Sequence, residues 1–547
     1  MIKYFITLIF GGFIGITSNA QSLLWSKSAG GFGTSDPLSQ CTDVSGNTYI
    51  TGLIEGFGQI VIFGTDTFNC PLNSDVFIAK YDINGNVLWA KTAGGTNTID
   101  GSLSVALDTT GNIFITGFFR CPSIIFGTYT LTNTGGGSGG SNIFIVKYNS
   151  NGNVIWAKNI GGIAGVYSDT GCSISTDKSG NVFISGSFNS PMLTFGTYTL
   201  THSFGTSSTS VFIAKYDNNG NVLWAKQGTG SSSKYNYCYS VCTDVNGNSF
   251  ISGSFLSPMI SFGTYTLSNP SLSNVFLVKY DINGNVQWAK SSTASGGGGG
   301  QTYSGSTDVN GNIYITGDYI NPSFAFSTYS LTSNGQEDIF LTKYDTNGNV
   351  LWAKSFGGIN RDVGWAICTF TNGLYVTGGF GSPITFGTTT LTPTASDPMF
   401  VTRFDLNGNV DCAINVGGGG EDNCGVGIDK YGNLYVSSDD YNVSYETAFV
   451  KKYSSCPSLA GIESIYKEGI TVRIYPNPNN GSFKIQIDNE INNGELILIN
   501  SLGQKVYEQT VRQGINNINT SDLAKGLYNY ILLQDKQKIK DGKLVVD

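Results

Sequence analysis

One twelve-residue phrase recurs along the chain and limits what the chain can fold into. The phrase KYDINGNVLWAK runs from Lys80 to Lys91, and close copies begin at Lys147, Lys215, Lys279 and Lys343. Two alternating apolar runs flank an Asn-Gly pair, and glycine adopts the positive φ that a tight turn needs. The phrase therefore predicts a β-hairpin. An EF-hand calcium loop needs glycine at its sixth position and glutamate at its twelfth, whereas here glycine is fourth and the glutamate is missing.

The phrase belongs to a longer repeat. Six tryptophans follow one another at intervals of 64 to 68 residues: Trp25, Trp89, Trp156, Trp224, Trp288 and Trp352. A second phrase, GNIFITG at Gly111, has relatives at Gly46, Gly180, Gly247, Gly311, Asn372 and Gly432. Each unit also has a short alternating run before this second phrase, so a unit supplies four strands and no helix. Seven such units predict an all-β fold, a seven-bladed β-propeller.

The two ends of the repeat are complementary. The chain begins with a lone fourth strand, LLWSK from Leu23, and the last unit stops at AFVKKY, from Ala448, without a fourth strand. We expect Leu23 to Lys27 to pair antiparallel with Ala448 to Tyr453, because a closed ring leaves no unpaired edge. Such closure also explains why the phrase degrades at Arg403 and disappears after Tyr453.

One position in the first strand of each unit carries only small residues. Cys41, Cys242 and Cys368 lie there, at the place of Ala106, Ser175, Ser306 and Gly427. We interpret this position as a steric requirement of the innermost strand, so these cysteines are not expected to form disulfides. Cys412 and Cys424 are the pair favoured for a bridge.

Composition and the N-terminus indicate the compartment. The formal net charge is −8, charged residues make up 12%, and no Lys/Arg cluster appears, which excludes a nucleic-acid partner. Met1 to Ala20 has one lysine, an apolar run and then small residues, which predicts a secretory signal peptide cleaved near Ala20. The apolar run is too short for a transmembrane anchor. No cysteine follows the cleavage site, so a lipoprotein anchor is not expected either.

The repeat and the C-terminus resemble known families. The combination of GN-aromatic-[IV]-[TS]-G, FIAKYDxNGN and WAKxxGG resembles the bacterial SBBP-type β-propeller repeats, which imply a scaffold without shared chemistry. The segment from about Ile474 resembles the type A C-terminal sorting domain of type IX secretion cargo. The matching residues are Tyr475, Pro476, Asn477, Pro478, Gly481, Gly503, Gly526, Tyr528 and Lys543.

The second resemblance implies a small antiparallel β-sandwich that directs export across the outer membrane and is then cleaved, often with lipopolysaccharide attachment. The type IX secretion machinery is therefore the expected partner, and the mature protein is expected to be secreted or attached to the cell surface. The expected boundaries are a signal peptide at 1–20, a propeller at 21–454, a linker at 455–469 and the sorting domain at 470–547.

The residues offer little catalytic chemistry. His202 is the only histidine, which argues against His-based triads and His metal sites, and a Cys nucleophile would lack its partner. We expect no catalytic residue, metal or cofactor, and favour a secreted or surface-held binding or adhesion module with a glycan or surface-protein ligand. The alternative is an extracellular polysaccharide hydrolase or lyase with a pair of acids at the channel mouth.

The ligand is expected on the face that collects the longer loops, because loops on a rigid scaffold usually carry function. Acids recur there after Gly-Gly, and they either cap the turn into the innermost strand or form a ring around a ligand. The candidates are Asp36, Asp100, Asp169, Asp362 and Asp422, together with Trp365, which lies outside the repeat pattern. Tyr129, Tyr198, Tyr265 and Tyr329, from FGTYTLT phrases on the same side, either stack on sugars or pack between blades.

Overall fold

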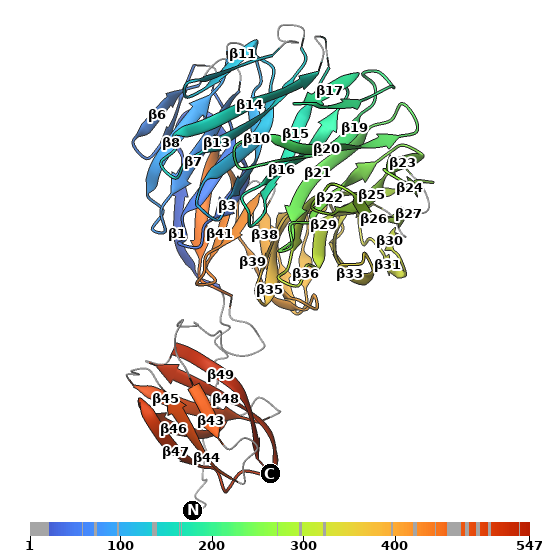
Figure 1. The fold of residues 1–547 in the computed structure, drawn as a ribbon. Helices are drawn as coiled ribbons and strands as arrows, with labels where there is room; N and C mark the ends of the chain where they lie inside the picture. Colours follow the sequence, from blue (N-terminus) through green and yellow to red (C-terminus); the bar gives the residue numbers. More distant parts are fainter. Residues whose placement is uncertain are drawn as a thin grey trace, which may run out of the picture. The chain divides into compact units, whose positions relative to one another are not determined.

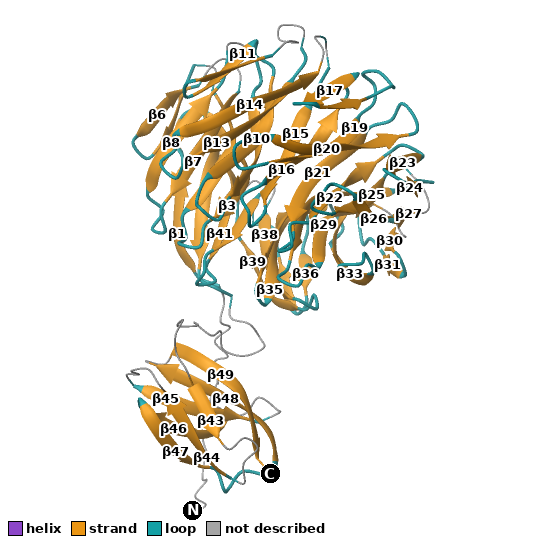
Figure 2. Cartoon of the chain, in the orientation of Figure 1, coloured by secondary structure: helices purple, strands orange, loops and turns teal. Residues whose placement is uncertain are grey.

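The computed structural model describes most of the chain after residue 20. The described residues are 21–56, 58–70, 74–95, 98–133, 139–162, 165, 167–270, 272–294, 298–320, 324–394, 398–418, 424–442, 445–456, 472–475, 481–487, 493–500, 505–534 and 537–546. They form strands and connecting loops, with no helix among them (Figure 2). The chain divides into two compact units, Met1–Cys456 and Pro457–Asp547. The expected signal peptide lies outside the described residues.

The first unit contains seven blades of four antiparallel strands each, which we number 1 to 7 in chain order (Figure 1); in blades 2 and 3 a short hairpin extends the sheet to six strands. Blade 1 consists of β3 (Thr34–Thr42), β4 (Thr48–Glu55), β7 (Asp75–Tyr81) and β8 (Val87–Ala93). Blade 2 consists of β9 (Gly101–Leu107), β10 (Ile113–Phe119), β13 (Asn142–Tyr148) and β14 (Val154–Gly162). Blade 3 consists of β15 (Thr170–Thr176), β16 (Val182–Phe188), β19 (Ser210–Tyr216) and β20 (Val222–Gly230).

The remaining four blades repeat this order. Blade 4 consists of β21 (Asn236–Thr243), β22 (Ser249–Phe255), β25 (Asn274–Tyr280) and β26 (Val286–Ser291). Blade 5 consists of β28 (Gly299–Thr307), β29 (Ile313–Ile320), β32 (Asp338–Tyr344) and β33 (Val350–Phe356). Blade 6 consists of β34 (Asp362–Phe370), β35 (Gly373–Phe380), β38 (Met399–Asp405) and β39 (Val410–Asn415). Blade 7 consists of β40 (Gly425–Ile428), β41 (Leu434–Asn442), β42 (Tyr445–Tyr453) and, from the N-terminus, β1 (Leu23–Ser28).

The first strands of the blades pack side by side in a complete cycle. Each contacts the first strand of the next blade, from β3 through β9, β15, β21, β28 and β34 to β40, and β40 also contacts β3. β1 pairs antiparallel with β42, with Lys27 opposite Val450 and Ser28 opposite Phe449. In Figure 1 the blue N-terminal strand accordingly lies with the orange strands of blade 7. The predicted all-β fold of seven blades is confirmed, and the N-terminal strand completes the last blade.

A hydrogen-bonded clamp between neighbouring blades accounts for the recurring phrase. Lys80 Nζ and Trp89 Nε1 of blade 1 both donate to the backbone oxygen of Ser150, at 3.0 and 3.2 Å, and Ser150 lies in the hairpin turn of blade 2. At four further interfaces the corresponding lysine and tryptophan both donate to one backbone oxygen in the hairpin turn of the next blade. The acceptor residues are Asn218, Ile282, Thr346 and Leu406. The lysine, the tryptophan and the turn must therefore recur together.

The N-terminal strand supplies the same clamp to blade 7. Trp25 Nε1 from β1 and Lys452 Nζ from β42 donate to the backbone oxygen of Ile83, at 3.0 and 3.3 Å. The Trp25 ring also contacts the ring of Tyr435 edge-on, with 6.0 Å between the centroids. β1 is thus part of the joint between blade 7 and blade 1 as well as part of a sheet.

The joint between blades 6 and 7 is different, because the chain leaves the first unit there. Arg403 and Cys412 are paired across β38 and β39 as Lys343 and Trp352 are paired in blade 5. Cys412 forms a disulfide with Cys456, with 6.4 Å between the Cα atoms, and Arg403 Nη1 donates to the backbone oxygen of Cys456. A covalent bond and an arginine therefore take the place of the tryptophan and lysine.

The predicted bridge between Cys412 and Cys424 is wrong. Cys412 lies in the outermost strand of blade 6, whereas Cys424 directly precedes the innermost strand of blade 7. Cys424 is a buried free thiol whose Sγ donates to Thr377 Oγ1 over 3.0 Å. The two cysteines are only twelve residues apart in the sequence. They belong to different blades, however, with Cys412 at the outer edge of blade 6 and Cys424 beside the innermost strand of blade 7.

Short hairpins follow the second strand of blades 1 to 6, and two of them extend the sheet of the preceding blade. β17 (Met192–Phe195) and β18 (Tyr198–Thr201) extend β14, while β23 (Met259–Phe262) and β24 (Tyr265–Ser268) extend β20. β5 (Ile60–Phe63) and β6 (Asp66–Asn69) pair with β2 (Gly30–Gly31), and β30 (Phe324–Phe326) and β31 (Tyr329–Leu331) pair with β27 (Thr293–Ala294). The others are β11 (Ser123–Phe126) with β12 (Tyr129–Thr132) and β36 (Ile384–Phe386) with β37 (Thr389–Leu391).

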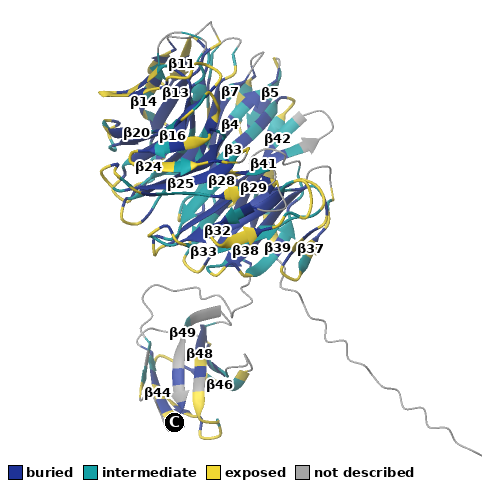
Figure 3. Ribbon diagram, turned by 90° about the vertical axis from the view of Figure 1, so that its right-hand side faces the viewer, coloured by how far each residue is buried: buried dark blue, intermediate teal, exposed yellow. Residues whose placement is uncertain are grey.

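The second unit consists of two antiparallel sheets. The first contains β43 (Val472–Tyr475), β44 (Ser482–Ile487) and β47 (Gly514–Asn519). The second contains β46 (Lys505–Val511), β45 (Gly494–Ile499), β48 (Gly526–Gln534) and β49 (Gln537–Val546). Alternate residues of these strands, among them Phe483, Leu496 and Leu532, form one buried cluster. In both units the buried residues follow the middle of the strands, and exposed residues gather in turns and loops (Figure 3).

Candidate ligand-binding site at the channel mouth

The two ends of the propeller strands differ in the loops they carry. At one end, tight turns join the first strand to the second and the third to the fourth, with glycine at positive φ, as at Gly85 (80°) and Gly111 (81°). At the other end, loops lead into the first strands, and longer loops that contain the short hairpins lead out of the second strands of blades 1 to 6. We call this second end the loop-rich face, and the region around the first strands on it the channel mouth.

The recurring aspartates on the loop-rich face bind backbone N–H groups. Asp100 is fully buried, and its Oδ1 accepts hydrogen bonds from the backbone N–H of Arg120 and Cys121 at 2.7 and 3.2 Å. Its Oδ2 accepts from the N–H of Gly95 at 3.1 Å. Asp100 thus ties the loop before the first strand of blade 2 to the loop after the second strand.

Asp169 and Asp362 have the same surroundings in blades 3 and 6. Asp169 accepts from the N–H of Asn189 and Ser190, and Asp362 accepts from the N–H of Gly358 at 2.7 Å and of Gly381 at 3.2 Å. Burial raises the pKa of Asp169 to about 6 and that of Asp362 to about 7.

These contacts support the interpretation of the aspartates as caps, and ligand binding by Asp100, Asp169 and Asp362 stays a prediction. Asp422 lies outside the described residues. Asp36 does not occupy the corresponding position in blade 1. The pair Asp362 and Phe380 of blade 6 corresponds to Ser35 and Ile54 of blade 1. Asp36, opposite Leu53, is therefore one residue further along the strand.

A β-bulge in the first strand of blades 4 to 6 carries an aromatic residue. The pairing of the strands shifts around Tyr239, Tyr303 and Trp365, so each lies unpaired at the bulge. In blades 1 to 3 the same place holds Leu38, Leu103 and Cys172. The first strands of blades 4 to 6 therefore each place an aromatic residue at the bulge.

The aromatic rings of neighbouring blades touch one another. The ring centroids of Tyr239 and Tyr303 are 5.6 Å apart, and those of Tyr303 and Trp365 are 4.5 Å apart. The row continues away from Tyr239 through Tyr237 and Tyr235, at 5.8 and 5.9 Å. Trp365 is buried at one end of this row, and Tyr235 is exposed at the other. We call these five residues the aromatic row.

Charged residues surround the Trp365 end of the row. The Arg361 guanidinium lies 5.7 Å from the centre of the Trp365 ring, and its Nε is 2.5 Å from Glu337 Oε2. The Tyr303 hydroxyl donates to Asp318 Oδ2 over 3.0 Å. Burial, and less strongly the charge of Glu337, raise the pKa of Asp318 to about 7.

A pocket of about 470 Å³ opens at the Tyr235 end of the row, between blades 3 and 4. Its described lining residues are Ser168, Thr170, Cys172, Ser187, Asn189, Thr206, Thr209, Tyr235 and Tyr237. None of them carries a charge. The Tyr235 and Tyr237 rings are almost parallel, with 4° between their planes, and form an aromatic wall.

His202 holds part of the pocket in place. Its Nδ1 lies 2.9 Å from Ser210 Oγ, and its Nε2 lies 3.0 Å from Ser208 Oγ and 3.1 Å from the backbone oxygen of Gly205. Burial lowers the pKa of the imidazole. His202 therefore orders the loop that contributes Thr206 and Thr209.

The repeated tyrosines of the hairpins have a packing role. The hydroxyls of Tyr129, Tyr198, Tyr265 and Tyr329 each donate to a backbone oxygen in the fourth strand of their own blade, at 2.6 to 2.7 Å. The hydrogen bonds support packing over sugar stacking, but they lie within one blade and not between blades as expected. They fasten each hairpin against the outer strand.

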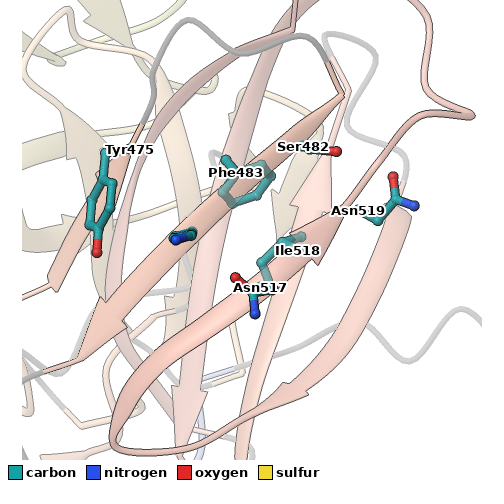
Figure 4. A pocket seen from close by; sticks show the side chains of 7 residues that line it. Tyr475, Ser482, Phe483, Asn517, Ile518 and Asn519 are labelled. Atoms are coloured by element: carbon teal, nitrogen blue, oxygen red, sulfur yellow. The ribbon is translucent and has the colours of Figure 1, made fainter.

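The sorting residues lie in the second unit. Tyr475 ends β43, and it lines a pocket of about 460 Å³ with Ser482, Phe483, Lys484, Asn517, Ile518 and Asn519 (Figure 4). Gly481 has φ of 91°, and the Tyr528 hydroxyl donates to the backbone oxygen of Ala524. Gly526 begins β48, and Lys543 pairs with Asn529 in β49. Pro476, Asn477, Pro478 and Gly503 lie outside the described residues.

The sequence prediction missed most of the aromatic row and the charged residues beside it. A usable signal was the alternation YNYCY from Tyr235, which places three tyrosines at alternate positions in and just before one first strand, a pattern that no other unit has. Asp318 was also detectable, because the other units have no acid at this place except Asp439. The contacts that these residues make with neighbouring blades could not be predicted from the sequence.

Comparison with known proteins identifies the C-terminal unit. Residues 473–547 match the family model of the secretion system C-terminal sorting domain. An uncharacterized WD repeat-containing protein, L264, of Acanthamoeba polyphaga mimivirus is 26% identical over 539 residues, which cover 82% of this chain and 38% of that protein. The regulatory protein FlaEY of Caulobacter vibrioides is 25% identical over 140 residues, covering 25% of this chain and 14% of that protein. The chain thus spans well under half of the length of these relatives.

Solved structures resemble the chain only distantly. PorZ, a surface component of the type IX secretion system of Porphyromonas gingivalis, has a TM-score of 0.36 and 10% identity, covering 94% of this chain and 59% of that chain. A protein of unknown function from Dyadobacter fermentans has a TM-score of 0.36 and 8% identity, covering 80% and 99%. Neither likeness carries an argument about function. The match of the family model from β43 to β49 does: residues 473–547 belong to the family of C-terminal sorting domains that direct export by the type IX secretion system.

Proposed function

We propose that this protein is a binding module that reaches the cell surface, or is released from it, by type IX secretion, and that it holds its ligand on the loop-rich face. Export is carried by the sorting domain at residues 473–547. Transit through the periplasm would follow removal of a signal peptide near Ala20. None of the described residues forms a helix that could span a bilayer.

The pocket at the Tyr235 end of the aromatic row carries the binding proposal. Ligand pockets are concave and largely preformed, with apolar or aromatic walls and a few placed polar groups. The pocket between blades 3 and 4 has this composition, while the opposite face has only tight turns. The surrounding strands belong to a closed ring of seven sheets, so the walls are held by rigid elements.

One observation favours the second candidate, an extracellular polysaccharide hydrolase or lyase. Asp318 and Glu337 lie at the charged end of the aromatic row, and a carboxyl with a pKa of about 7 can hold a proton near neutral pH. Against this role, Glu337 is paired with Arg361 and Asp318 is only 4% exposed. The binding function is therefore the better supported of the two.

An array of glycans and matrix proteins, probed with the whole secreted chain, tests the proposal. We expect retention on the array, and a loss of that retention when Tyr235 is changed to alanine. Binding that persists in Tyr235→Ala but fails when the tight turn at Asn84 and Gly85 is altered would place the ligand on the other face. Release of new reducing ends or unsaturated products from an arrayed polysaccharide would favour the enzyme.

A further inference from the structure

We infer that the pocket between blades 3 and 4 takes a neutral saccharide, stacked against Tyr235 and hydrogen-bonded by the hydroxyls that line the pocket. The inference rests on the proposed binding function and names its ligand class. Four properties of the pocket lead to it: its aromatic wall, its unused hydroxyls, its lack of charge and its rigidity.

The first property is the pairing of an aromatic wall with a hydroxyl wall. A sugar ring presents C–H groups on its faces and hydroxyls around its rim. The face of an aromatic ring carries partial negative charge and attracts C–H groups, and Tyr235 is 40% exposed, so part of its ring is free for such contact. Ser168, Thr170 and Thr206 line the same pocket.

The second property is that these three hydroxyls are unused. Within the described part of the chain, the side-chain hydroxyls of Ser168, Thr170 and Thr206 make no hydrogen bond. Their backbone atoms do: the Ser168 N–H donates to Asn189 Oδ1 at 2.6 Å, and the Thr206 oxygen accepts from Asn189 Nδ2 at 3.3 Å. The backbone is thus held while each hydroxyl can donate one bond and accept two.

The third property is the absence of charge from the nine described residues that line the pocket. The carboxylate of Asp169, which lies between two lining residues in the sequence, accepts hydrogen bonds from the backbone N–H groups of Asn189 and Ser190. A uronate, sulfate or phosphate would find no cation among these residues to offset the loss of its water. Neutral hydroxyl groups meet no such penalty.

The fourth property is rigidity and size. His202 orders the loop of Thr206, and the Thr209 hydroxyl donates to the backbone oxygen of Asn236 at 2.6 Å while accepting from its N–H at 2.8 Å. A preformed wall lowers the entropy cost of binding. A volume of about 470 Å³ suits a short saccharide, since small-ligand pockets span roughly 300–1,000 Å³.

A proline-rich peptide is the main competitor, because such peptides dock in aromatic grooves. Proline has no N–H, so a proline-rich stretch offers few partners to three neighbouring hydroxyls. Groups left unpaired on binding reduce affinity. Saccharide hydroxyls pair with them directly, which is why we commit to the saccharide.

The test uses the whole secreted chain and isothermal titration. The probes are neutral gluco-, manno-, galacto- and xylo-oligosaccharides, oligouronates of matched length and one proline-rich peptide. For a neutral oligosaccharide we expect at least about tenfold weaker binding in Tyr235→Ala, a change of less than about threefold in Tyr235→Phe, which keeps the ring, and several-fold weaker binding in Thr206→Val. Tyr431→Ala is the matched control, because Tyr431 is 53% exposed in a tight turn on the opposite face.

The outcomes separate the inference from the proposed function. Binding of only the oligouronates or the peptide, weakened by Tyr235→Ala, overturns the saccharide and leaves the binding site standing. Saccharide binding that is equal in Tyr235→Ala and Tyr431→Ala overturns both the pocket and the ligand assignment. No binding of any probe overturns the saccharide inference, and the protein array then decides the proposed function separately.

Discussion

Buried and exposed carboxylates of this chain differ in what stabilises their charge. Asp82, in an exposed turn, accepts hydrogen bonds from the N–H groups of Asn84 and Asn86 and from the Asn86 amide. Asp318 is 4% exposed at the charged end of the aromatic row, and its pKa is raised to about 7 by burial and by Glu337. The first acid shapes a turn at any pH near neutral, while the second makes stability depend on pH.

We expect the Asp318 carboxyl to destabilise the folded propeller as pH rises. Its pKa is about 7 in the folded protein and 3.8 in its reference state. The folded state therefore binds the proton more tightly, and the stabilisation is complete below pH about 4 and lost as pH rises through 7. The loss is on the order of 2–4 kcal/mol. Asp318→Asn keeps an acceptor for Tyr303 and should show a flatter profile of unfolding free energy between pH 5 and 8; parallel profiles would contradict this assignment.

The clamps between blades act at the scale of elements. Each joins a lysine and a tryptophan of one blade to a turn of the next, so neighbouring sheets are fixed at the tight-turn end. Packing of the first strands fixes the same sheets along the channel. The two special joints, at β1 and at the Cys412–Cys456 disulfide, lie on either side of blade 7. Blade 7 is therefore where ring closure can be tested.

Trp25→Ala should weaken the joint between blades 7 and 1. The change removes the bond to the Ile83 oxygen and the contact with Tyr435. Since Trp25 is only partly buried, we expect a loss on the order of 2–4 kcal/mol, at the lower end for a large aromatic residue. Leu24→Ala is the matched control, because Leu24 is 51% exposed on the same strand and should change stability by less than about 0.5 kcal/mol. Equal denaturation midpoints for the two variants would refute the role of β1 in the joint.

Cys412→Ser and Cys456→Ser should each destabilise the propeller. The disulfide closes a loop of 44 residues, and loss of such a bridge costs about 2–4 kcal/mol. Thermal melts of the wild type should drop to those of the variants when a reductant is added, whereas the variants should not respond. Cys172→Ser, at a free and partly exposed thiol, serves as the control. A wild-type melt that is insensitive to reductant would argue against this joint.

For the molecule as a whole, the disulfide also defines where the propeller ends. Cys456 is the last residue of the first compact unit, and the second unit begins at Pro457. Arg403 and Cys412 hold Cys456 from blade 6. The sorting domain, which begins at residue 473, therefore follows in the sequence after a chain end that is fastened at Cys456.

A chain that stops after Cys456 should fold but fail to reach the cell surface, because it lacks the sorting domain. Protease accessibility of intact cells and fractionation of the periplasm measure this. A second truncation, after Tyr453, removes Cys456 and should accumulate in a less stable form. Surface display of either truncated chain would contradict the assigned route of export.

The repeat determined much of this protein from sequence alone. Strand periodicity and the spacing of tryptophans are local properties, so the seven blades, the complementary ends and the sandwich could be predicted. The loop containing His202 could also be assigned to the loop-rich face, because loop lengths distinguish the two ends of a blade.

The tertiary structure alone decided which residues meet. Tyr239, Tyr303 and Trp365 are more than 60 residues apart from one to the next, and they touch because each lies at the bulge of a first strand and neighbouring first strands pack side by side. Cys456 bonds to Cys412 because, in blade 7, the end of the propeller chain lies where the other blades have the hairpin turn between their third and fourth strands. Asp100 and Asp362 cap loops because they are buried and accept hydrogen bonds from backbone N–H groups. Such contacts depend on the directions of side chains and on the residues that neighbouring blades bring close. The periodicity of the sequence gives no information about either.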